Sequence, residues 1–305
     1  MMLSQDLIKK RILVFGSNGM LGQRVIEIYK KQPGIELMTT SSEENSIFPD
    51  IPYVPCDVTH RDSVKKIIYD FVPDVIINAS AYTNVDKCET ERELSWKVNV
   101  KGVEYICEAC RVLDTHLIHI STDYVFDGTK GPYSEIDTPS PVSYYGRTKL
   151  ASENAIKVSG AAHTIIRTNV LYGVISSGRL DFVRWVVNSI RKGEKIRIVT
   201  DQINNPTFLD DLAGAIAEII RFKKYGLYNV GGRELLSRYD FTMKIVDFFN
   251  LDPSFVTAIV TAELNQPAKR PLKSGLIILK AESEFNYKPV SIDESLAIMK
   301  KELNL

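Results

Sequence analysis

The sequence predicts a doubly wound α/β fold, with a parallel central sheet and a smaller, discontinuous second lobe. In the first half of the chain, short apolar segments alternate with amphipathic segments of helical length, an order typical of strand–helix–strand crossover units. The apolar segments lack polar alternation, as expected when helices cover both faces of a sheet. A glycine-rich turn joins the first apolar segment to the first helical one. Together these observations predict a Rossmann-type domain.

The elements follow in a regular order up to about residue 170. We predict helices between successive strands, and the helix over 61–71 ends near Pro73 because proline cannot continue a helix. A parallel sheet of this kind binds its ligand at the carboxyl ends of the strands. The predicted strands cover 11–15, 35–40, 74–80, 116–122 and 163–170, and the predicted helices cover 19–31, 61–71, 89–113 and 144–159.

Beyond residue 170 the alternation loosens. A helix is expected within 176–193, and a helix over 206–222 followed by a strand over 226–232 is expected to return to the sheet. From 237 onwards, helices, prolines and short strands are mixed. We therefore predict a dinucleotide-binding domain and a substrate-binding lobe. The first would comprise 1–170 plus about 200–232, and the second about 171–199 and 233–305.

Composition argues against several classes of protein. Lys plus Arg (38) balances Asp plus Glu (38), and no basic stripe stands out, so binding to nucleic acid is not expected. No apolar run approaches the ~20 residues that a membrane-spanning helix needs. The N-terminal stretch "MMLSQDLIKKR" lacks the apolar segment of a signal peptide. We expect a soluble, cytoplasmic protein.

The cysteines and two histidines are interpreted as structural. Cys107 and Cys110 form a C-x-x-C inside a predicted helix, but no second cysteine pair completes a zinc site and no thioredoxin-like turn precedes them. His116 and His119 are three apart on a predicted strand, so they point to opposite faces and cannot easily share a metal. We predict no metal site.

The glycine-rich turn has the spacing G-x-x-G-x-x-G. Glycine permits the tight turn and lets the backbone approach a pyrophosphate, while the following helix offers free N–H groups and a favourable dipole. Glycines also serve ordinary turns, but here they stand in the strand–turn–helix context of a dinucleotide site. The expected cofactor contacts in this turn are Gly16, Asn18, Gly19, Met20, Leu21 and Gly22.

The end of the second strand bears on which dinucleotide is bound. An acid there would bind the ribose 2′-OH and repel a 2′-phosphate. This strand ends instead in hydroxyls, at Thr39, Thr40, Ser41 and Ser42, and we expect Thr39 and Ser41 to contact the cofactor. The missing acid favours NADPH. No arginine stands nearby and Glu43 and Glu44 follow, so NADH remains the alternative.

The stretch "CDVT" offers a further contact. Asp57 is a candidate for the adenine edge, with Val58 beside it. An equal alternative is that Asp57 serves as an acid near the N-terminus of the following helix.

Tyr145 and Lys149 are four apart on the helix predicted over 144–159, and therefore share one helical face. Tyr144 pairs with Thr148 instead, and is interpreted as a packing residue. A phenol with a pKa near 10 exchanges protons poorly at neutral pH unless its pKa shifts. A neighbouring ammonium lowers that pKa, so the pair predicts acid–base catalysis by Tyr145.

Several long motifs are together similar to the extended short-chain dehydrogenase/reductase family, and within it to the dTDP-4-dehydrorhamnose reductases. The resemblance covers nearly the whole chain. It implies NAD(P)H-dependent reduction of the C4 ketone of a nucleotide-linked 4-keto-6-deoxy sugar, in the first place dTDP-4-dehydro-L-rhamnose. The motifs are "GSNGMLG", "PDVIINASAYTNVDKCE", "STDYVFDGTKGPYSEIDTPSPVSYYGRTKLASE", "IIRTNVLYG", "DQINNPTFLDDLA" and "RPLKSGL".

The resemblance also implies roles for single residues. Thr122 would hydrogen-bond the substrate carbonyl, Tyr145 would donate the proton, and Lys149 would hold the nicotinamide ribose and tune Tyr145. Further cofactor contacts would be Asn78, Ala79, Ser80, Ala81 and Asn99, and substrate contacts Thr83, Thr122, Asp123, Asn169 and Arg270. For Arg270, an ordinary surface salt bridge is the alternative to substrate binding.

Two other functions remain open. An epimerase or 4,6-dehydratase shares the fold, but such dehydratases carry an Asp-Glu pair after the threonine, where this chain has Asp123 and Tyr124. A non-catalytic subunit similar to the regulatory subunit of methionine adenosyltransferase would bind a nucleotide and a protein partner. Family members often carry a tryptophan after "RTS", where this chain reads "RTNV", which leaves the sugar open. A homodimer through about residues 89–111 and 143–159 is expected from such folds.

Overall fold

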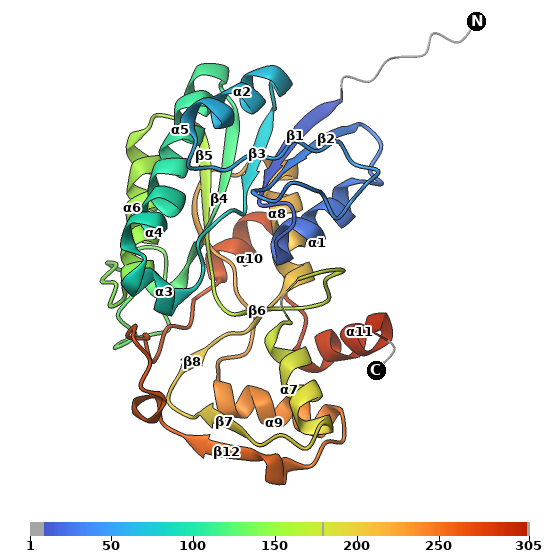
Figure 1. Ribbon diagram of the computed structural model, residues 1–305, viewed down its shortest axis with the longest axis vertical. Coiled ribbons are helices and arrows are strands. Elements are labelled where there is room, and N and C mark those ends of the chain that lie inside the picture. The colour runs from blue at the N-terminus through green and yellow to red at the C-terminus, as the bar shows by residue number, and fades with distance from the viewer. Residues whose placement is uncertain (1–8, 179, 304–305) are drawn as a thin grey trace, which may run out of the picture.

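The computed structural model describes residues 9–178 and 180–303. Its upper half is a six-stranded sheet in the order β10-β5-β4-β3-β1-β2 (Figure 1), and neighbouring strands run parallel. The predicted doubly wound fold class is confirmed. Residues 1–8 of the polar N-terminal stretch lie outside the described residues. The strands are β1 (Lys10–Phe15), β2 (Ile35–Thr40), β3 (Val75–Asn78), β4 (His116–Thr122), β5 (His163–Thr168) and β10 (Gly226–Asn229).

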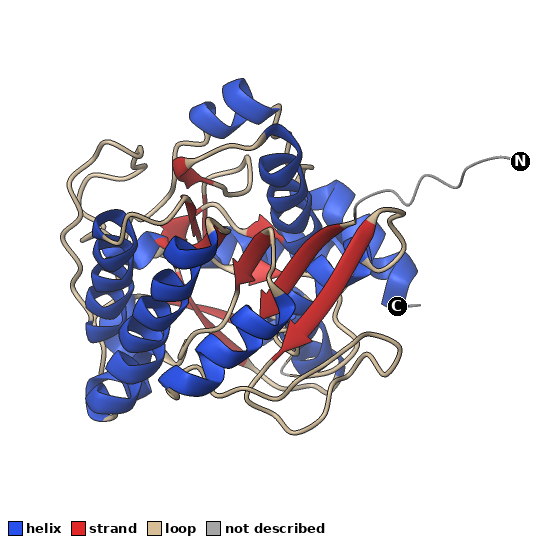
Figure 2. Cartoon of the chain, turned by 90° about the horizontal axis from the view of Figure 1, so that it is seen from above, coloured by secondary structure: helices blue, strands red, loops and turns tan. Residues whose placement is uncertain are grey.

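Helices cover both faces of this sheet, which explains its unbroken apolar strands. Side chains in β1 alternate between the two faces: Ile12 and Val14 pack into one apolar core, while Leu13 and Phe15 pack into the other. Figure 2 shows the strands lying between the two groups of helices. One core includes α1 (Met20–Tyr29), α8 (Leu209–Phe222) and α10 (Leu279–Phe285), and the other includes α2 (Arg61–Phe71), α5 (Gly102–Leu113) and α6 (Tyr144–Val158).

The helix predicted over 89–113 begins later in the structure: the helical backbone runs without interruption from Arg92 to Leu113, and the residues before it belong to a separate short helix. The backbone breaks at Glu91 (φ −103°, ψ 49°), which separates two short helices. A π-helical turn then leads into α5, and such turns often occur at functional sites. Here the turn carries Asn99, which bonds to the loop after β3. The pieces are α3 (Val85–Thr90), α4 (Arg92–Trp96), the π-turn Lys97–Lys101 and α5.

The second lobe lies below the sheet in Figure 1 and has its own apolar core. The predicted division of the chain into two parts differs from the structure at α10. The sequence predicts this segment to lie in the substrate lobe, but its residues Ala281 and Phe285 belong to the core of the main sheet. No helix in the described ranges combines the length and apolarity needed to cross a membrane. The lobe core draws on α7 (Phe182–Arg191), β7 (Ile196–Val199), α9 (Arg238–Phe248) and α11 (Ile292–Leu303), with β12 (Val256–Ile259) paired to β7.

Two short strand pairings and one returning segment connect the lobe to the sheet. β11 (Leu236–Ser237) pairs with β8 (Ile203–Asn204), and β6 (Leu171–Tyr172) pairs with β9 (Thr207–Phe208). The segment after Arg270 runs back beside the sheet, where Lys273 N donates to Gly128 O at 2.9 Å. This segment therefore brings the second lobe to the carboxyl end of β4.

Candidate active site

The glycine turn is built for close backbone contact. Gly16 has φ +77°, and a Cβ there would lie 2.7 Å from Ser80 N. A Cβ on Gly22 would lie 2.2 Å from Gly16 O, so the helix packs directly on the turn. Gly19 caps α1 without a side-chain oxygen, so no side-chain cap occupies the first N–H groups of the helix. These features are those of a pyrophosphate cradle.

One cavity follows this turn along the carboxyl ends of β1, β2 and β3. It collects many of the predicted cofactor contacts, namely Gly16, Gly19, Ser41, Asp57, Val58, Ala79, Ser80 and Ala81. Asp57 Oδ1 also accepts a hydrogen bond from Thr59 N at 2.8 Å, so this acid lines the cavity and also lies shortly before α2. Phe15, Ser42, Glu43, Cys56, Tyr82 and Val98 complete the lining.

Other residues of the glycine turn support it rather than face the cavity. Asn18 Nδ2 donates to Asn45 O at 2.9 Å and therefore ties the turn to the loop after β2. Leu21 is buried in the apolar core, and Met20 packs against that core. For Met20, Leu21 and Gly22, the backbone is therefore the part available to a cofactor.

Thr39 and Asn78 differ from expectation. Thr39 is fully buried, and its hydroxyl donates to Pro52 O at 2.9 Å, so it cannot contact a cofactor. Asn78 is also buried; its Oδ1 accepts from Ser80 N at 3.1 Å and from Ser80 Oγ at 2.6 Å. Asn78 thus shapes the cavity wall from beneath. Thr39 lies on β2 and Asn78 ends β3, and the side chains of both are buried.

Asn99 holds the same wall from the π-turn. Its Oδ1 accepts from Tyr82 N at 2.7 Å, and its Nδ2 donates to Tyr82 O at 3.2 Å and to Thr148 Oγ1 at 3.0 Å. The amide therefore links the loop after β3 to α6. This connection fixes the cavity relative to the helix that carries Tyr145 and Lys149.

Thr122, Tyr145 and Lys149 come together at the carboxyl end of β4. Thr122 is the last residue of β4, and α6 starts at Tyr144 after the N-cap Ser143. A Cβ on Gly146 would lie 2.1 Å from Tyr124 O, so α6 approaches the turn after Thr122 closely. The ring of Tyr145 packs edge-on against Tyr124, with centroids 5.8 Å apart.

The electrostatics of Tyr145 differ from the predicted lowering of its pKa. Burial raises the pKa of Tyr145 above its ordinary value, and the charge of Asp123 raises it further. A hydrogen-bonding interaction with the Thr122 side chain works in the opposite direction. The Lys149 ammonium does not counter the burial, because it is bound elsewhere. The phenol therefore keeps its proton at neutral pH.

Lys149 is buried and binds β4. Its Nζ donates to Ile120 O at 2.7 Å and lies 3.1 Å from His119 Nε2. Burial lowers the pKa of Lys149 to about 8, against the opposing charge of Glu153. Burial also lowers the pKa of His119 well below its ordinary value, so that ring is neutral. The Lys149 ammonium therefore loses its proton closer to neutral pH than an ordinary lysine does.

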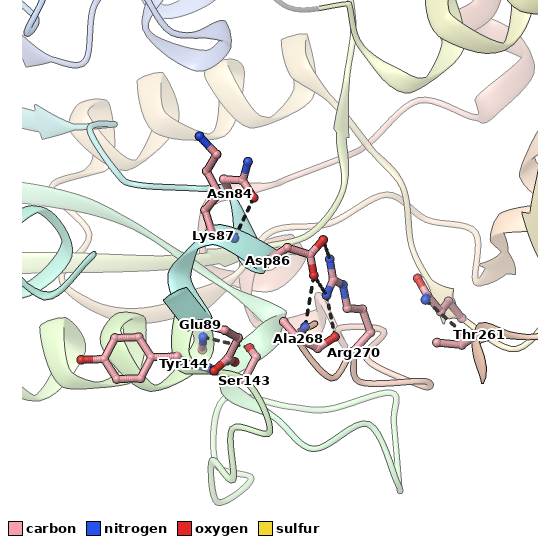
Figure 3. Close-up of polar contacts among 11 residues, drawn as sticks. Asn84, Asp86, Lys87, Glu89, Ser143, Tyr144, Thr261, Ala268 and Arg270 are labelled. Carbon is pink, nitrogen blue, oxygen red and sulfur yellow. Dashed lines mark hydrogen bonds and ion pairs between the residues drawn. The ribbon is translucent and has the colours of Figure 1, made fainter. Parts of the chain in front are cut away.

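The two adjacent tyrosines have different surroundings. Tyr144 N donates to Glu89 Oε1 at 2.7 Å, and the Arg92 guanidinium stacks over the Tyr144 ring at 5.1 Å. In Figure 3 this ring points away from Arg270. Tyr145 packs instead against Tyr124, beside Thr122. Of the two phenols, Tyr145 is the one placed at the end of β4.

Comparisons with known proteins bear on this arrangement of turn, cavity and side chains. The family model described as the RmlD substrate binding domain matches residues 10–305. A dTDP-4-dehydrorhamnose reductase from Aggregatibacter actinomycetemcomitans is 33% identical over 291 residues, 92% of this chain and 94% of that protein. The chain belongs to the dTDP-4-dehydrorhamnose reductase family.

Two further similarities extend this result. A probable low-salt glycan biosynthesis reductase from Haloferax volcanii is 31% identical over 289 residues, 94% of this chain and 96% of the relative. The crystal structure of a dTDP-4-dehydrorhamnose reductase from Bacillus anthracis in complex with NADP superposes with a TM-score of 0.85 at 30% identity. That superposition covers 96% of this chain and 99% of the other.

In this member of the family, Asp123 directly follows the last residue of β4. It accepts from Thr122 Oγ1 at 3.0 Å and from Ser274 Oγ at 2.5 Å. Burial raises the pKa of Asp123 to about 6, although both hydrogen bonds act to lower it. Ser274 belongs to the segment that returns from the second lobe, so this carboxyl joins the lobe to Thr122.

Arg270 is neither a solvated surface group nor a free cation. Its guanidinium forms a two-pronged ion pair with Asp86 on α3, at 2.6 Å and 2.7 Å (Figure 3). Only 9% of its side chain is exposed. The same carboxylate accepts from Ala268 N at 3.1 Å. The pair therefore attaches the second lobe to the loop region after β3.

The two remaining predicted substrate contacts differ in their accessibility. Thr83 is exposed in the loop before α3, and its side chain is accessible. Asn169 is buried: its Nδ2 donates to Asn205 Oδ1 at 2.7 Å, and its Oδ1 accepts from Thr207 Oγ1 at 2.9 Å. The amide of Asn169 is thus engaged by protein at both ends.

Sequence reasoning did not find three features of this site. Glu43 lines the cavity, and the available signal was its position shortly after Ser41. The contact of His119 with Lys149 required knowing which strand face meets α6. Asp86 carried no local signal, because 184 residues separate it from Arg270.

Proposed function

We propose that this chain is an NADPH-dependent reductase, with NADH as the alternative cofactor. It reduces the C4 ketone of a nucleotide-linked 4-keto-6-deoxy sugar, in the first place dTDP-4-dehydro-L-rhamnose to dTDP-L-rhamnose. The observation that carries the proposal is the gathering of Thr122, Tyr145 and Lys149 at the end of β4. This strand pairs with β3, and the loop after β3 lines the glycine-turn cavity. The names of the relatives and the NADP complex of the Bacillus anthracis structure support it.

The residues present fit a dinucleotide. Gly16 and Gly19 line the cavity, and the start of α1 is free of a side-chain cap. Asp57 and Val58 would hold the adenine end, and Ala79, Ser80 and Ala81 would line the path towards Tyr145. The nicotinamide, when bound, supplies the hydride.

The chain's own groups handle the ketone oxygen. As that oxygen gains negative charge, Tyr145 donates its phenolic proton, which burial has kept on the ring. The Thr122 hydroxyl hydrogen-bonds the same oxygen, and the proton that it now shares with Asp123 turns towards the substrate. Lys149, in its protonated form, would hold the cofactor ribose from its place against β4.

The proposal also covers the role of the second lobe, the oligomeric state and the location in the cell. The lobe over about 171–199 and 233–305, apart from α10, would hold the sugar nucleotide against the end of β4. A homodimer through about 89–111 and 143–159 and a cytoplasmic location belong to the same proposal.

The test is turnover by the purified protein alone. We expect NADPH to be oxidised when dTDP-4-dehydro-L-rhamnose is added, with dTDP-L-rhamnose as the product identified by mass spectrometry. A non-catalytic subunit would bind nucleotide but oxidise no NADPH at saturating concentrations of both compounds. That outcome would contradict the proposal.

A second incubation separates the reductase from a dehydratase. Asp123 is followed by Tyr124, so the second acid of a dehydratase is missing. We expect no 4-keto product from dTDP-glucose and NAD⁺. If that product appeared, the reaction class would be wrong even though dinucleotide binding held.

A further inference from the structure

The loop after β2 places a carboxylate in the cofactor cavity. Gly16 N and Ser17 N both donate to Thr40 O, at 2.9 Å and 3.1 Å, so the end of β2 lies directly beside the glycine turn. The next residues, Ser41, Ser42 and Glu43, line the cavity. A dinucleotide whose pyrophosphate follows the glycine turn would have its adenosine ribose beside this loop.

Neighbouring hydroxyls hold Glu43 in place through its side chain and its backbone. The Ser41 hydroxyl donates to the Glu43 carboxylate, and the Tyr53 hydroxyl donates to Glu43 O. Tyr53 itself is held by an extra edge pairing, in which Val54 N donates to Thr39 O at 3.1 Å. The carboxylate is therefore oriented by its neighbours while its side chain stays exposed.

The charges around the cavity favour a hydroxyl over a phosphate at this place. Among the lining residues, the ionisable carboxylates are Glu43 and Asp57, and no lysine or arginine lines the cavity in the part of the chain described. The Ser41 hydroxyl already donates to Glu43, and the Thr39 hydroxyl is buried on Pro52. A 2′-phosphate would thus meet a negative charge without a compensating cation.

We propose that Glu43 replaces the acid missing from the end of β2: it accepts a hydrogen bond from the adenosine ribose 2′-OH and disfavours a 2′-phosphate. Glu43 is thereby the residue that keeps NADH competitive with NADPH in this chain. The inference rests on the proposed dinucleotide-dependent function and assigns a specificity determinant within it.

Titration of cofactor binding without substrate tests the proposal. NADPH and NADH are titrated against the wild-type chain, Glu43→Gln and Glu44→Gln, with fluorescence as the readout. Glutamine keeps an acceptor for Ser41 but removes the charge, and the neighbouring Glu44 does not line the cavity. We expect Glu43→Gln to shift the affinity ratio towards NADPH by about tenfold, and Glu44→Gln to leave it near that of the wild type.

The outcomes are distinguishable. If both dinucleotides bind and Glu43→Gln leaves their ratio unchanged, or if Glu44→Gln shifts it equally, the role of Glu43 is overturned and the reductase proposal stands. If neither dinucleotide binds the wild-type chain, the proposed function fails, and the role of Glu43 fails with it.

Discussion

Tyr145 and Lys149 lie on one helical face, yet their side chains bind different partners. The ring of Tyr145 turns to Tyr124 and Thr122, while the Lys149 ammonium turns to His119 and the Ile120 carbonyl of β4. Spacing along a helix therefore brought the pair to the site, but burial set their protonation. Each of the two residues leads to its own prediction.

Tyr145→Phe keeps the ring and its packing but removes the proton donor. We expect turnover to fall by ~10²–10⁴, the usual contribution of general acid catalysis, while NADPH affinity stays near normal. Tyr144→Phe is the matched control, because the ring of Tyr144 faces Arg92 instead. Steady-state reduction of the keto sugar measures both. Wild-type turnover in Tyr145→Phe, or a dead Tyr144→Phe, would refute the assignment.

Lys149 predicts a pH dependence of cofactor binding. Burial lowers the pKa of Lys149 from 10.5 to about 8, so the ammonium is present below that pH and lost above it. The anionic dinucleotide is held partly by this charge, so its affinity is expected to fall as pH rises through about 8. Titrations between neutral and alkaline pH measure the effect. Lys149→Met should bind weakly without this step, and an identical step in that variant would assign the titration to another group.

At the scale of elements, α6 is fixed to the sheet by a buried ion pair. Arg167 on β5 binds Glu153 through two hydrogen bonds, at 2.9 Å and 2.7 Å, and Ser121 on β4 donates to the same carboxylate at 2.6 Å. Glu153 lies four residues after Lys149, on the same face of α6. The Glu153–Arg167 pair and Ser121 therefore hold α6 against β4 and β5.

The junction of the glycine turn and α1 gives a prediction at this scale. Gly22→Ala would place a Cβ 2.2 Å from Gly16 O, so the turn must move. We expect a loss of ~1–3 kcal/mol in the free energy of unfolding and a clear loss of dinucleotide affinity. Denaturant unfolding and cofactor titration measure the two effects.

Gly214→Ala on α8 is the control for Gly22→Ala. Nothing lies within 4 Å of a Cβ at this position. Because alanine is the better helix former, the variant is expected to gain up to ~1 kcal/mol of stability with unchanged cofactor affinity. Unchanged cofactor affinity in Gly22→Ala would show that close packing of α1 on the turn is dispensable.

At the scale of the whole molecule, a returning segment attaches the second lobe to the domain that contains the six-stranded sheet. Arg270 binds Asp86, Ser274 binds Asp123, and Tyr133 N donates to Gly275 O at 2.7 Å. These contacts surround the end of β4 from the lobe side. The position of the lobe over Thr122 therefore depends on groups far from Thr122 and Tyr145 in sequence.

The Asp86–Arg270 pair can be tested by a double-mutant cycle. If Arg270 acts through its attachment to Asp86, then Arg270→Met and Asp86→Asn should raise the KM for the sugar nucleotide alike. The double variant should be little worse than either single one, with a coupling of ~0.5–3 kcal/mol. Dinucleotide affinity should stay constant in all three. A far larger KM in Arg270→Met alone would indicate direct contact of Arg270 with the substrate.

Local patterns in the sequence determined much of this protein. Apolar segments alternating with amphipathic ones predicted the order and type of the main strands and helices, because these periodicities are properties of neighbouring residues. The turn with Gly16 and Gly22, and the pair Tyr145 and Lys149, were readable for the same reason, since each lies within one or two adjacent elements.

The tertiary structure alone decided the features that depend on distant partners. It interrupted the helix predicted over 89–113 at Glu91 and placed Asn99 in a π-turn, where Asn99 bonds to Tyr82. It also enclosed the Thr39 hydroxyl against Pro52. It paired Arg270 with a carboxylate 184 residues away. A side chain's charge and accessibility depend on what the folded chain brings against it, and no local spacing encodes that contact.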